Sequence, residues 1–217
     1  MERPNEVYWQ TRIKGVAAAL EANNFLAYQV GDLDAARKIA MEQIFPGTGA
    51  KSVSWGGSMT LASSGICDAL KQVPGLEVLD TFDRTLTPEE SVALRRRSLL
   101  VDLFITGTNA VTEDGVLVNL DMFGNRVGAI NFGAKNVIVL VGRNKIVPDL
   151  DAAMFRIKNH AAPANAMRLD KKTPCVKTSY CEECKSPDRI CNVWSITEKS
   201  FPKGRIRVIL INQDLGL

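Results

Sequence analysis

Histidine is almost absent from this chain, since His160 is the only one among 217 residues. A Ser-His-Asp triad or a Cys-His pair would have to use that side chain, and no Gly-x-Ser-x-Gly nucleophile turn accompanies it. We expect His160 to lie near the end of a helix, where an imidazole interacts favourably with the helix dipole. Hydrolysis by a nucleophilic triad is therefore not the expected activity.

Long apolar runs are also absent. No stretch approaches the roughly 18 consecutive apolar residues that a membrane-spanning helix requires. Residues 1–14 carry Glu2, Arg3, Glu6 and Arg12 and contain no apolar segment, so they do not resemble a secretory signal. These absences predict a cytoplasmic protein without a membrane partner, in a compartment where thiols stay reduced.

A strong charge of one sign is missing as well. The 27 basic and 24 acidic residues leave a formal charge of only +3, whereas nucleic-acid-binding domains usually concentrate a basic stripe. With 46% hydrophobic and 24% charged residues, the composition is that of a globular protein. We expect one domain over residues 1–217 and no nucleic-acid partner.

Short apolar runs alternate with segments of helical periodicity. The expected strands are 25–30, 51–55, 76–79, 103–106, 116–120, 136–141 and 206–211, and the expected helices are 5–23, 32–44, 59–70, 88–100 and 150–159. The β-branched run at 136–141 is typical of a central strand buried on both faces. This alternation predicts an α/β fold with a mostly parallel sheet flanked by helices.

The alternation breaks between residues 161 and 200, which hold prolines, lysines and four cysteines. Because strand 206–211 follows this segment, we interpret it as an irregular insertion before the last strand. Its cysteines are spaced Cys175-x5-Cys181-x2-Cys184-x6-Cys191. Two cysteines two residues apart can chelate one metal ion from a tight turn, and two more complete a tetrahedral thiolate set.

We therefore predict that Cys175, Cys181, Cys184 and Cys191 bind one metal ion or cluster. The loop has few apolar residues, so metal binding would supply its folding energy. The spacing suits zinc and a [4Fe–4S] cluster equally, because only one CxxC pair is present and prolines flank the ligands. Free thiols or a redox pair are the alternative, and Cys67 is expected to be a buried core residue.

Two glycine-containing loops follow predicted strands. Gly56, Gly57 and Ser58 come after strand 51–55, and Gly107, Thr108 and Asn109 come after strand 103–106. Ligands of parallel sheets bind at the carboxyl ends of strands, where glycine allows close approach and free N–H groups favour an anion. The alternative is that Ser58 only caps a helix and the glycines only make turns. We expect a pocket for a small anionic metabolite.

A polar segment then surrounds strand 116–120. Glu113 precedes it and could act as nucleophile or general base, although its Asp-Gly neighbour also signals a plain hairpin turn. Asp121 is a second candidate catalytic carboxylate. Asn119, Asn125 and Arg126 would bind the anion, with Arg126 as a bidentate clamp. By contrast, the run 95–97 of three arginines is expected to be a solvated helix end.

Several of these runs resemble the LUD-domain (lactate utilisation) family. They are residues 55–60 (Trp-Gly-Gly-Ser-Met-Thr), 106–119, 124–147, 181–192 and 205–216, so that the resemblance covers nearly the whole chain. It implies a fold like that of sugar-phosphate isomerases and CoA transferases. The best-understood members of this family belong to bacterial lactate oxidation systems, which carry iron–sulfur clusters on partner subunits. The resemblance therefore implies a related role. The four-cysteine loop departs from the small lactate subunits and shifts the metal prediction toward iron–sulfur.

The expected function is thus an iron–sulfur LUD protein, active in electron transfer or in the oxidation of a small organic acid, with a redox partner protein. One alternative is a non-redox acyl or CoA transferase, or an isomerase, with a structural zinc loop. In a transferase, fold analogy would make Glu113 the acyl acceptor. Another is a metabolite-binding module without catalysis. The sequence is compatible with both a monomer and a homodimer.

Overall fold

The structure is a computed structural model that describes residues 4–217, and its strands form two sheets. The larger sheet has six strands, all parallel, in the order β1-β10-β7-β4-β2-β3. They are β1 (Leu26–Val30), β2 (Ser52–Trp55), β3 (Glu77–Leu79), β4 (Leu103–Gly107), β7 (Asn136–Gly142) and β10 (Ile206–Ile211). The predicted α/β fold with a mostly parallel sheet is confirmed.

Strand β7 lies inside this sheet, as its β-branched composition predicts. Its register places Thr106 of β4 opposite Val139 and Ile209 of β10 opposite Leu140. Val137, Val139 and Val141 pack toward one face of the sheet, while Ile138 and Leu140 pack toward the other. The strand is therefore covered by hydrophobic side chains on both sides.

One face of the sheet is covered by short helices. These are α2 (Leu33–Ile39), the π-helical turn Ala40–Ile44, α3 (Phe45–Thr48), α4 (Met59–Ala62) and α5 (Ile66–Lys71). Asp32 caps α2 by accepting the Ala35 N–H, and the buried Trp55 and Leu70 belong to the core on this side. The predicted helix 59–70 is thus divided in two, because Gly65 takes a positive φ between α4 and α5.

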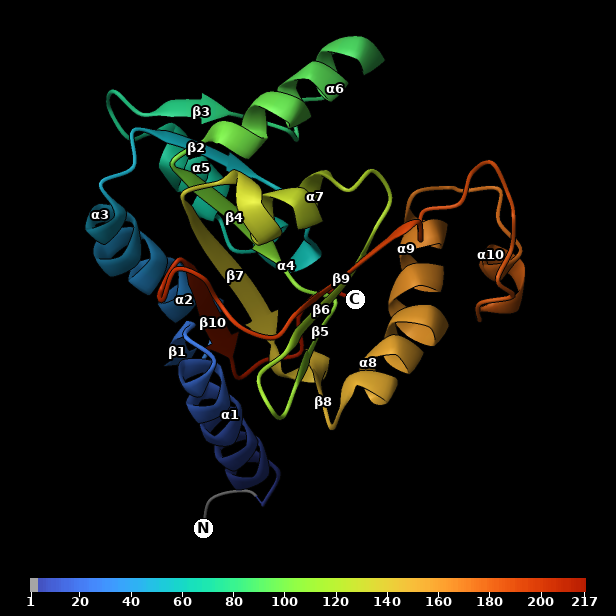
Figure 1. Ribbon diagram of the computed structural model, residues 1–217, viewed down its shortest axis with the longest axis horizontal. Coiled ribbons are helices and arrows are strands. Elements are labelled where there is room, and N and C mark those ends of the chain that lie inside the picture. Colours follow the sequence, from blue (N-terminus) through green and yellow to red (C-terminus); the bar gives the residue numbers. More distant parts are fainter. Residues whose placement is uncertain (1–3) are drawn as a thin grey trace.

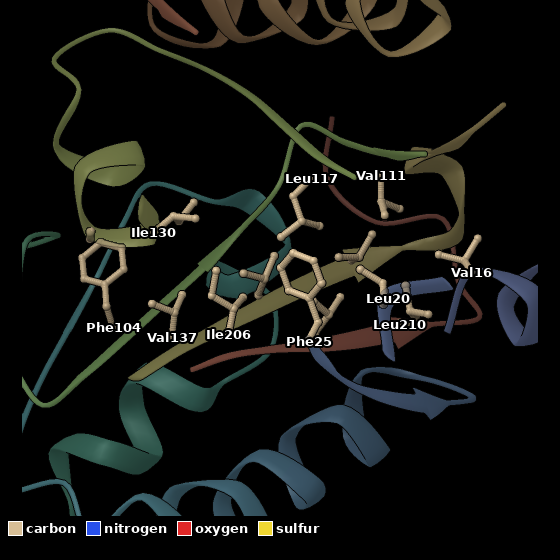
Figure 2. Close-up of a cluster of buried hydrophobic side chains, with 14 of the residues drawn as sticks. Val16, Leu20, Phe25, Phe104, Val111, Leu117, Ile130, Val137, Ile206 and Leu210 are labelled. Atoms are coloured by element: carbon tan, nitrogen blue, oxygen red, sulfur yellow. The ribbon is translucent and has the colours of Figure 1, made fainter. Parts of the chain in front are cut away.

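The other face is covered by α1 (Pro4–Ala22), by α7 (Asn125–Gly128) with the following π-helical turn Ala129–Gly133, and by the second sheet. Figure 2 shows this core, in which Leu20 and Phe25 approach Leu117, Val111 and Leu210. Helix α6 (Pro88–Arg97) ends in the 3-10 turn Ser98–Leu100, and Thr87 with Glu90 forms a capping box at its start.

The second sheet has the order β8-β5-β6-β9 and combines segments far apart in sequence. Its strands are β5 (Ala110–Thr112), β6 (Leu117–Asp121), β8 (Ile146–Val147, after the 3-10 turn Arg143–Lys145) and β9 (Val193–Thr197). Strands β5, β8 and β9 were not predicted, because two or three residues show no period and β9 is half exposed.

The expected irregular insertion at 161–200 is partly regular. Helix α8 (Leu150–Arg156) continues through the π-helical turn Ile157–Ala161 into α9 (Ala162–Arg168), and the short helix α10 (Cys175–Thr178) follows. In Figure 1 these helices lie on the side of the molecule away from α1–α3. The segment then returns as β9, which pairs antiparallel with β6. No helix of residues 4–217 combines the length and apolar character that crossing a membrane would need.

The turn Thr112–Gly115 joins β5 to β6 as an antiparallel hairpin. Gly115 has a φ of +83°, and a Cβ there would lie 2.8 Å from the backbone carbonyl carbon of Ala19 and the nitrogen of Leu20 in α1. The turn therefore packs directly against the helix backbone.

We predict that Gly115→Ala lowers the free energy of unfolding by roughly 2–4 kcal/mol, because it combines a left-handed backbone with a backbone collision. Urea unfolding followed by circular dichroism measures the change. Gly47→Ala is the matched control, since nothing lies within 4 Å of a Cβ at that helical position. Equal stability of the two variants would contradict the close packing of the turn.

Candidate functional site

A cavity of about 400 Å³ lies where β4 and β6 end, between α4, α7 and α9. The residues predicted from the sequence that line it are Gly57, Ser58, Gly107, Thr108, Asn109, Asp121, Asn125 and Arg126. Three further predicted residues, Gly56, Asn119 and Glu113, are not among its lining. Strand ends thus bring together most of the polar positions that were selected, as expected for a parallel sheet.

The two glycine loops meet at Ser58. Its Oγ accepts the Leu61 N–H at 3.2 Å and so caps α4, the alternative already named for this residue. A Cβ on Gly107 would lie 2.5 Å from the same Oγ, so glycine is what lets β4 pass so close to the cap. Gly57 has open space around its Cα and faces the cavity.

Arg126 occupies the centre of the polar network, with only 6% of the residue exposed. One terminal nitrogen donates to Gly107 O (3.2 Å) and Asn119 Oδ1 (2.5 Å). The other terminal nitrogen donates to Asn109 Oδ1 (2.9 Å) and Leu120 O (3.1 Å).

The remaining donor, Nε of Arg126, points to Asp121 Oδ1 at 3.4 Å. All five N–H groups are therefore directed at protein acceptors. The expected bidentate clamp on a ligand is consequently not what this geometry provides, because a ligand would have to displace one of these bonds. Burial lowers the pKa of Arg126, and the charge of Asp121 opposes that shift.

Asp121 is committed to the same network. Its second oxygen accepts the backbone N–H of Arg126 at 3.1 Å, so the carboxylate orders the start of α7. Gly56 lies against the aliphatic part of the Arg126 side chain, where a Cβ would approach Arg126 Cγ to 2.9 Å. The fully buried Asn119 has no acceptor for its Nδ2 within residues 4–217.

Glu113 lies apart from the cavity, on the hairpin turn. Its carboxylate pairs with Arg12 of α1 at 2.5 Å, and about half of its side chain is exposed. The hairpin interpretation of the Glu-Asp-Gly segment is therefore correct. Glu113 does not lie with the candidate residues that line the cavity.

Lys145 was not selected as a site residue from the sequence. It follows the strongly apolar strand β7. The 3-10 turn Arg143–Lys145 places its side chain in the cavity lining with 4% of the residue exposed. Its Nζ donates to Thr60 Oγ1 at 3.1 Å. Burial, reinforced by the charges of Arg156 and Arg126, lowers the pKa of Lys145 from 10.5 to about 7.

Three further cations line the cavity: Arg95, Arg168 and Lys171. Arg95 was expected to be a solvated helix end, but its guanidinium lies over the Phe123 ring at 5.2 Å from the centroid. With Arg126 and Lys145 the lining holds five cationic side chains, against one acidic side chain, that of Asp121. The cavity is therefore suited to an anion.

A second, much smaller cavity of about 20 Å³ contains all four loop cysteines in its lining. Cys175, Cys181, Cys184 and Cys191 come together there although they span 17 positions of the chain. They surround one space, but no three His, Cys, Asp or Glu side chains in the described part of the chain are arranged as a set that could hold a metal ion. Burial raises the pKa of Cys191.

The cysteine loop is held by polar contacts that the sequence analysis did not foresee. Arg189 donates to Cys184 O (2.8 Å) and to Cys191 O (2.9 Å). Lys158 pairs with Glu183 at 2.6 Å. These contacts act in addition to the metal binding that was expected to supply the folding energy of the loop.

Several donors lie beside the sulfurs. The Glu183 N–H donates to Cys181 Sγ at 3.4 Å, and Lys158 Nζ lies 3.8 Å from the same atom. Thr173 Oγ1 is 3.2 Å from Cys175 Sγ. Polar and cationic groups therefore surround the sulfurs of Cys175 and Cys181.

The two cavities adjoin each other. Ala162 at the start of α9 and Ile190, beside Cys191, belong to the lining of both. The cysteine loop therefore forms part of the wall between them. Sequence spacing alone does not encode this juxtaposition, because it depends on the path of the chain from α9 to β9.

We predict that Arg126→Lys lowers the free energy of unfolding by roughly 2–5 kcal/mol, because an ammonium cannot satisfy the acceptors around the guanidinium. Urea unfolding measures the loss. Arg95→Lys is the control, since Arg95 lines the same cavity but contacts an exposed ring. Unchanged stability of Arg126→Lys would show that the network is not structural.

A pH dependence follows from Lys145. Between pH 7 and 10.5 the unfolded chain binds this proton more often than the folded chain does, so stability should rise with pH across that window. Lys145→Met removes this titrating group, so its free energy of unfolding should lack the rise. The free energy of unfolding of the variant minus that of the unsubstituted chain should therefore fall by up to about 1.4 kcal/mol per pH unit as the pH rises. Urea unfolding at pH 7, 8 and 9 measures it; parallel curves would contradict the assignment.

Comparison with known proteins identifies one family. A family model described as the LUD domain matches residues 13–211. Among solved structures, a DUF162 family protein from Deinococcus radiodurans is 13% identical and aligns over 95% of this chain and 98% of that one, with a TM-score of 0.45. That likeness is too low to add to the description of the fold. No curated protein matches the chain.

Proposed function

The chain belongs to the LUD-domain family. On that premise we propose that it is a redox protein that binds a small organic acid and either oxidises it or takes part in electron transfer. The acid would occupy the 400 Å³ cavity, and the four loop cysteines would hold an iron–sulfur cluster next to it. A redox partner protein would exchange electrons with that cluster.

One observation carries this proposal: the cysteine cavity and the cationic cavity share Ala162 and Ile190 as a common wall. A purely structural staple could lie anywhere on the surface. A redox centre, by contrast, must lie close to the compound with which it exchanges electrons. The arrangement therefore favours a joint role for the two sites.

The cationic cavity supports the organic-acid part of the proposal. Arg95, Arg168 and Lys171 leave donors for a carboxylate, while Arg126 contributes its charge without a free N–H group. Apolar residues such as Ile157 and Leu120 line the cavity too, so it suits a compound with both charged and hydrocarbon parts.

The four thiols fit an iron–sulfur cluster by their chemistry, because such clusters are held by cysteine thiolates. When bound, a cluster would supply one-electron transfer. The Glu183 N–H and Lys158 beside Cys181 would stabilise the thiolate charge, and hydrogen bonds of this kind set the reduction potential of clusters.

A zinc ion is the second candidate, and the size of the cysteine cavity favours it. A space of about 20 Å³ is comparable to that of one water molecule and is therefore closer in size to a single ion than to a cluster. A four-iron cluster would require the loop to open. In the zinc case the loop is a structural staple and the protein is a non-redox enzyme, such as an acyl transferase or isomerase, or a binding module.

We predict that anaerobically prepared protein contains iron and sulfide and shows an EPR signal on reduction, because four cysteine side chains line one space and cysteines are the usual ligands of such clusters. Cys181→Ser and Cys184→Ser should each lose most of the metal. Cys67→Ser is the control, since Cys67 is buried in the core beneath α4 and α5, outside the cysteine loop. Its pKa is raised to about 12, chiefly by burial. Cluster reconstitution and metal analysis of all variants measure the result.

The alternatives give distinct results in the same experiment. A colourless protein with one zinc per chain would overturn the redox proposal and support the structural loop. A chain that takes up neither metal, or loses metal equally in the Cys67→Ser control, would overturn both assignments of the cysteine loop.

A further inference from the structure

We propose that Lys145 is a nucleophilic amine that captures the carbonyl group of a small organic anion as an imine. This inference rests on the proposed anion pocket and names its ligand class more closely: an acid that carries an aldehyde or ketone, such as a 2-oxo acid. It does not depend on the cysteine loop.

The position of Lys145 is the first argument. Its side chain reaches from the end of β7 into the cavity lining and is almost completely buried. None of the ion pairs within residues 4–217 includes it, and the two charged side chains that act on it, Arg156 and Arg126, are both cations. A buried lysine with a purely structural role is normally paired with an acid.

The hydrogen bonding around Nζ is the second argument. The Thr60 hydroxyl donates its proton to Leu215 O at 3.3 Å, so its oxygen serves as acceptor for Lys145 Nζ at 3.1 Å. Thr60 therefore orients the amine without engaging its lone pair. A Cβ on Gly216 would lie only 3.3 Å from Nζ, so residues 215–217 cover the amine on one side.

The electrostatic setting is consistent with this geometry. Burial and the two neighbouring guanidiniums lower the pKa of Lys145 to about 7, so much of the amine is neutral near neutral pH. An ordinary lysine is almost fully protonated there and is a poor nucleophile. Desolvation beside other cations is a known way to activate a lysine toward carbonyl compounds.

The remaining cations supply recognition. Arg95, Arg168 and Lys171 line the same cavity and can hold a carboxylate, while the carbonyl carbon lies against Nζ. Arg126 is not needed as a ligand, because its N–H groups are already directed at protein acceptors. The pocket thus pairs charged groups for the acid with an amine for the carbonyl.

The step needs no other reagent. The Nζ lone pair forms a bond to the carbonyl carbon, and the C=O π electrons move to oxygen, which takes up the proton released by nitrogen. The hydroxyl of this carbinolamine takes up one proton from solvent and leaves as water, which gives the protonated iminium. Loss of the remaining N–H proton to solvent then gives the neutral imine, so that the protons balance. The products are an imine and one water.

Reductive trapping of the full chain tests the proposal. The protein is incubated with glyoxylate and sodium cyanoborohydride and digested, and the modified lysines are located by peptide mass spectrometry. We expect Lys145 to be labelled at least about tenfold faster than the exposed Lys38, with a half-maximal rate near pH 7. Lys145→Arg should abolish that label, and Lys38→Arg should leave it unchanged.

The peptide map of the natural chain gives the result even if Lys145→Arg does not fold. Labelling spread evenly over exposed lysines would overturn the proposal. Calorimetry with malonate, which has carboxylates but no reactive carbonyl, separates the two claims. Malonate binding without a Lys145 adduct would overturn the amine and keep the pocket, whereas absence of binding by both compounds would overturn the anion pocket itself.

Discussion

The buried guanidinium of Arg126 is the interaction on which the site depends. It joins Gly107 O, at the end of the parallel sheet, to Asn119 and Leu120 of the second sheet, so one side chain connects both sheets at the cavity. Because a guanidinium is planar and always charged, it can hold several acceptors in a fixed relation. The positions of the strand-end loops, and hence the shape of the cavity, follow from this connection.

Much of the fold could be predicted, because its signals are local. Strand β7 shows its burial in its own composition, and the two glycine loops mark the ends of β2 and β4. The short strands of the second sheet could not be found in this way. Two or three residues carry no periodicity, and β9 reaches β6 only because the chain returns after the cysteine loop.

Most of the residues selected from the sequence line the cavity, but several of them have other roles than those expected. Arg126 was expected to clamp an anion, and only the structure shows that its donors are already occupied by protein acceptors. Glu113 fits a catalytic motif but lies on a hairpin against α1. Lys145 and Arg95 carry no motif at all, since their meaning comes from burial and from contacts between elements distant in sequence.

The saturation of Arg126 has a consequence for how such a protein can diverge. The residue that holds the two sheets together does not need to touch a ligand, whereas Arg95, Arg168 and Lys171 line the cavity without any part in the guanidinium network. Substitutions at these three positions could therefore change the charge and shape of the cavity at little cost to stability. A scaffold of this kind separates its evolvable positions from its structural ones.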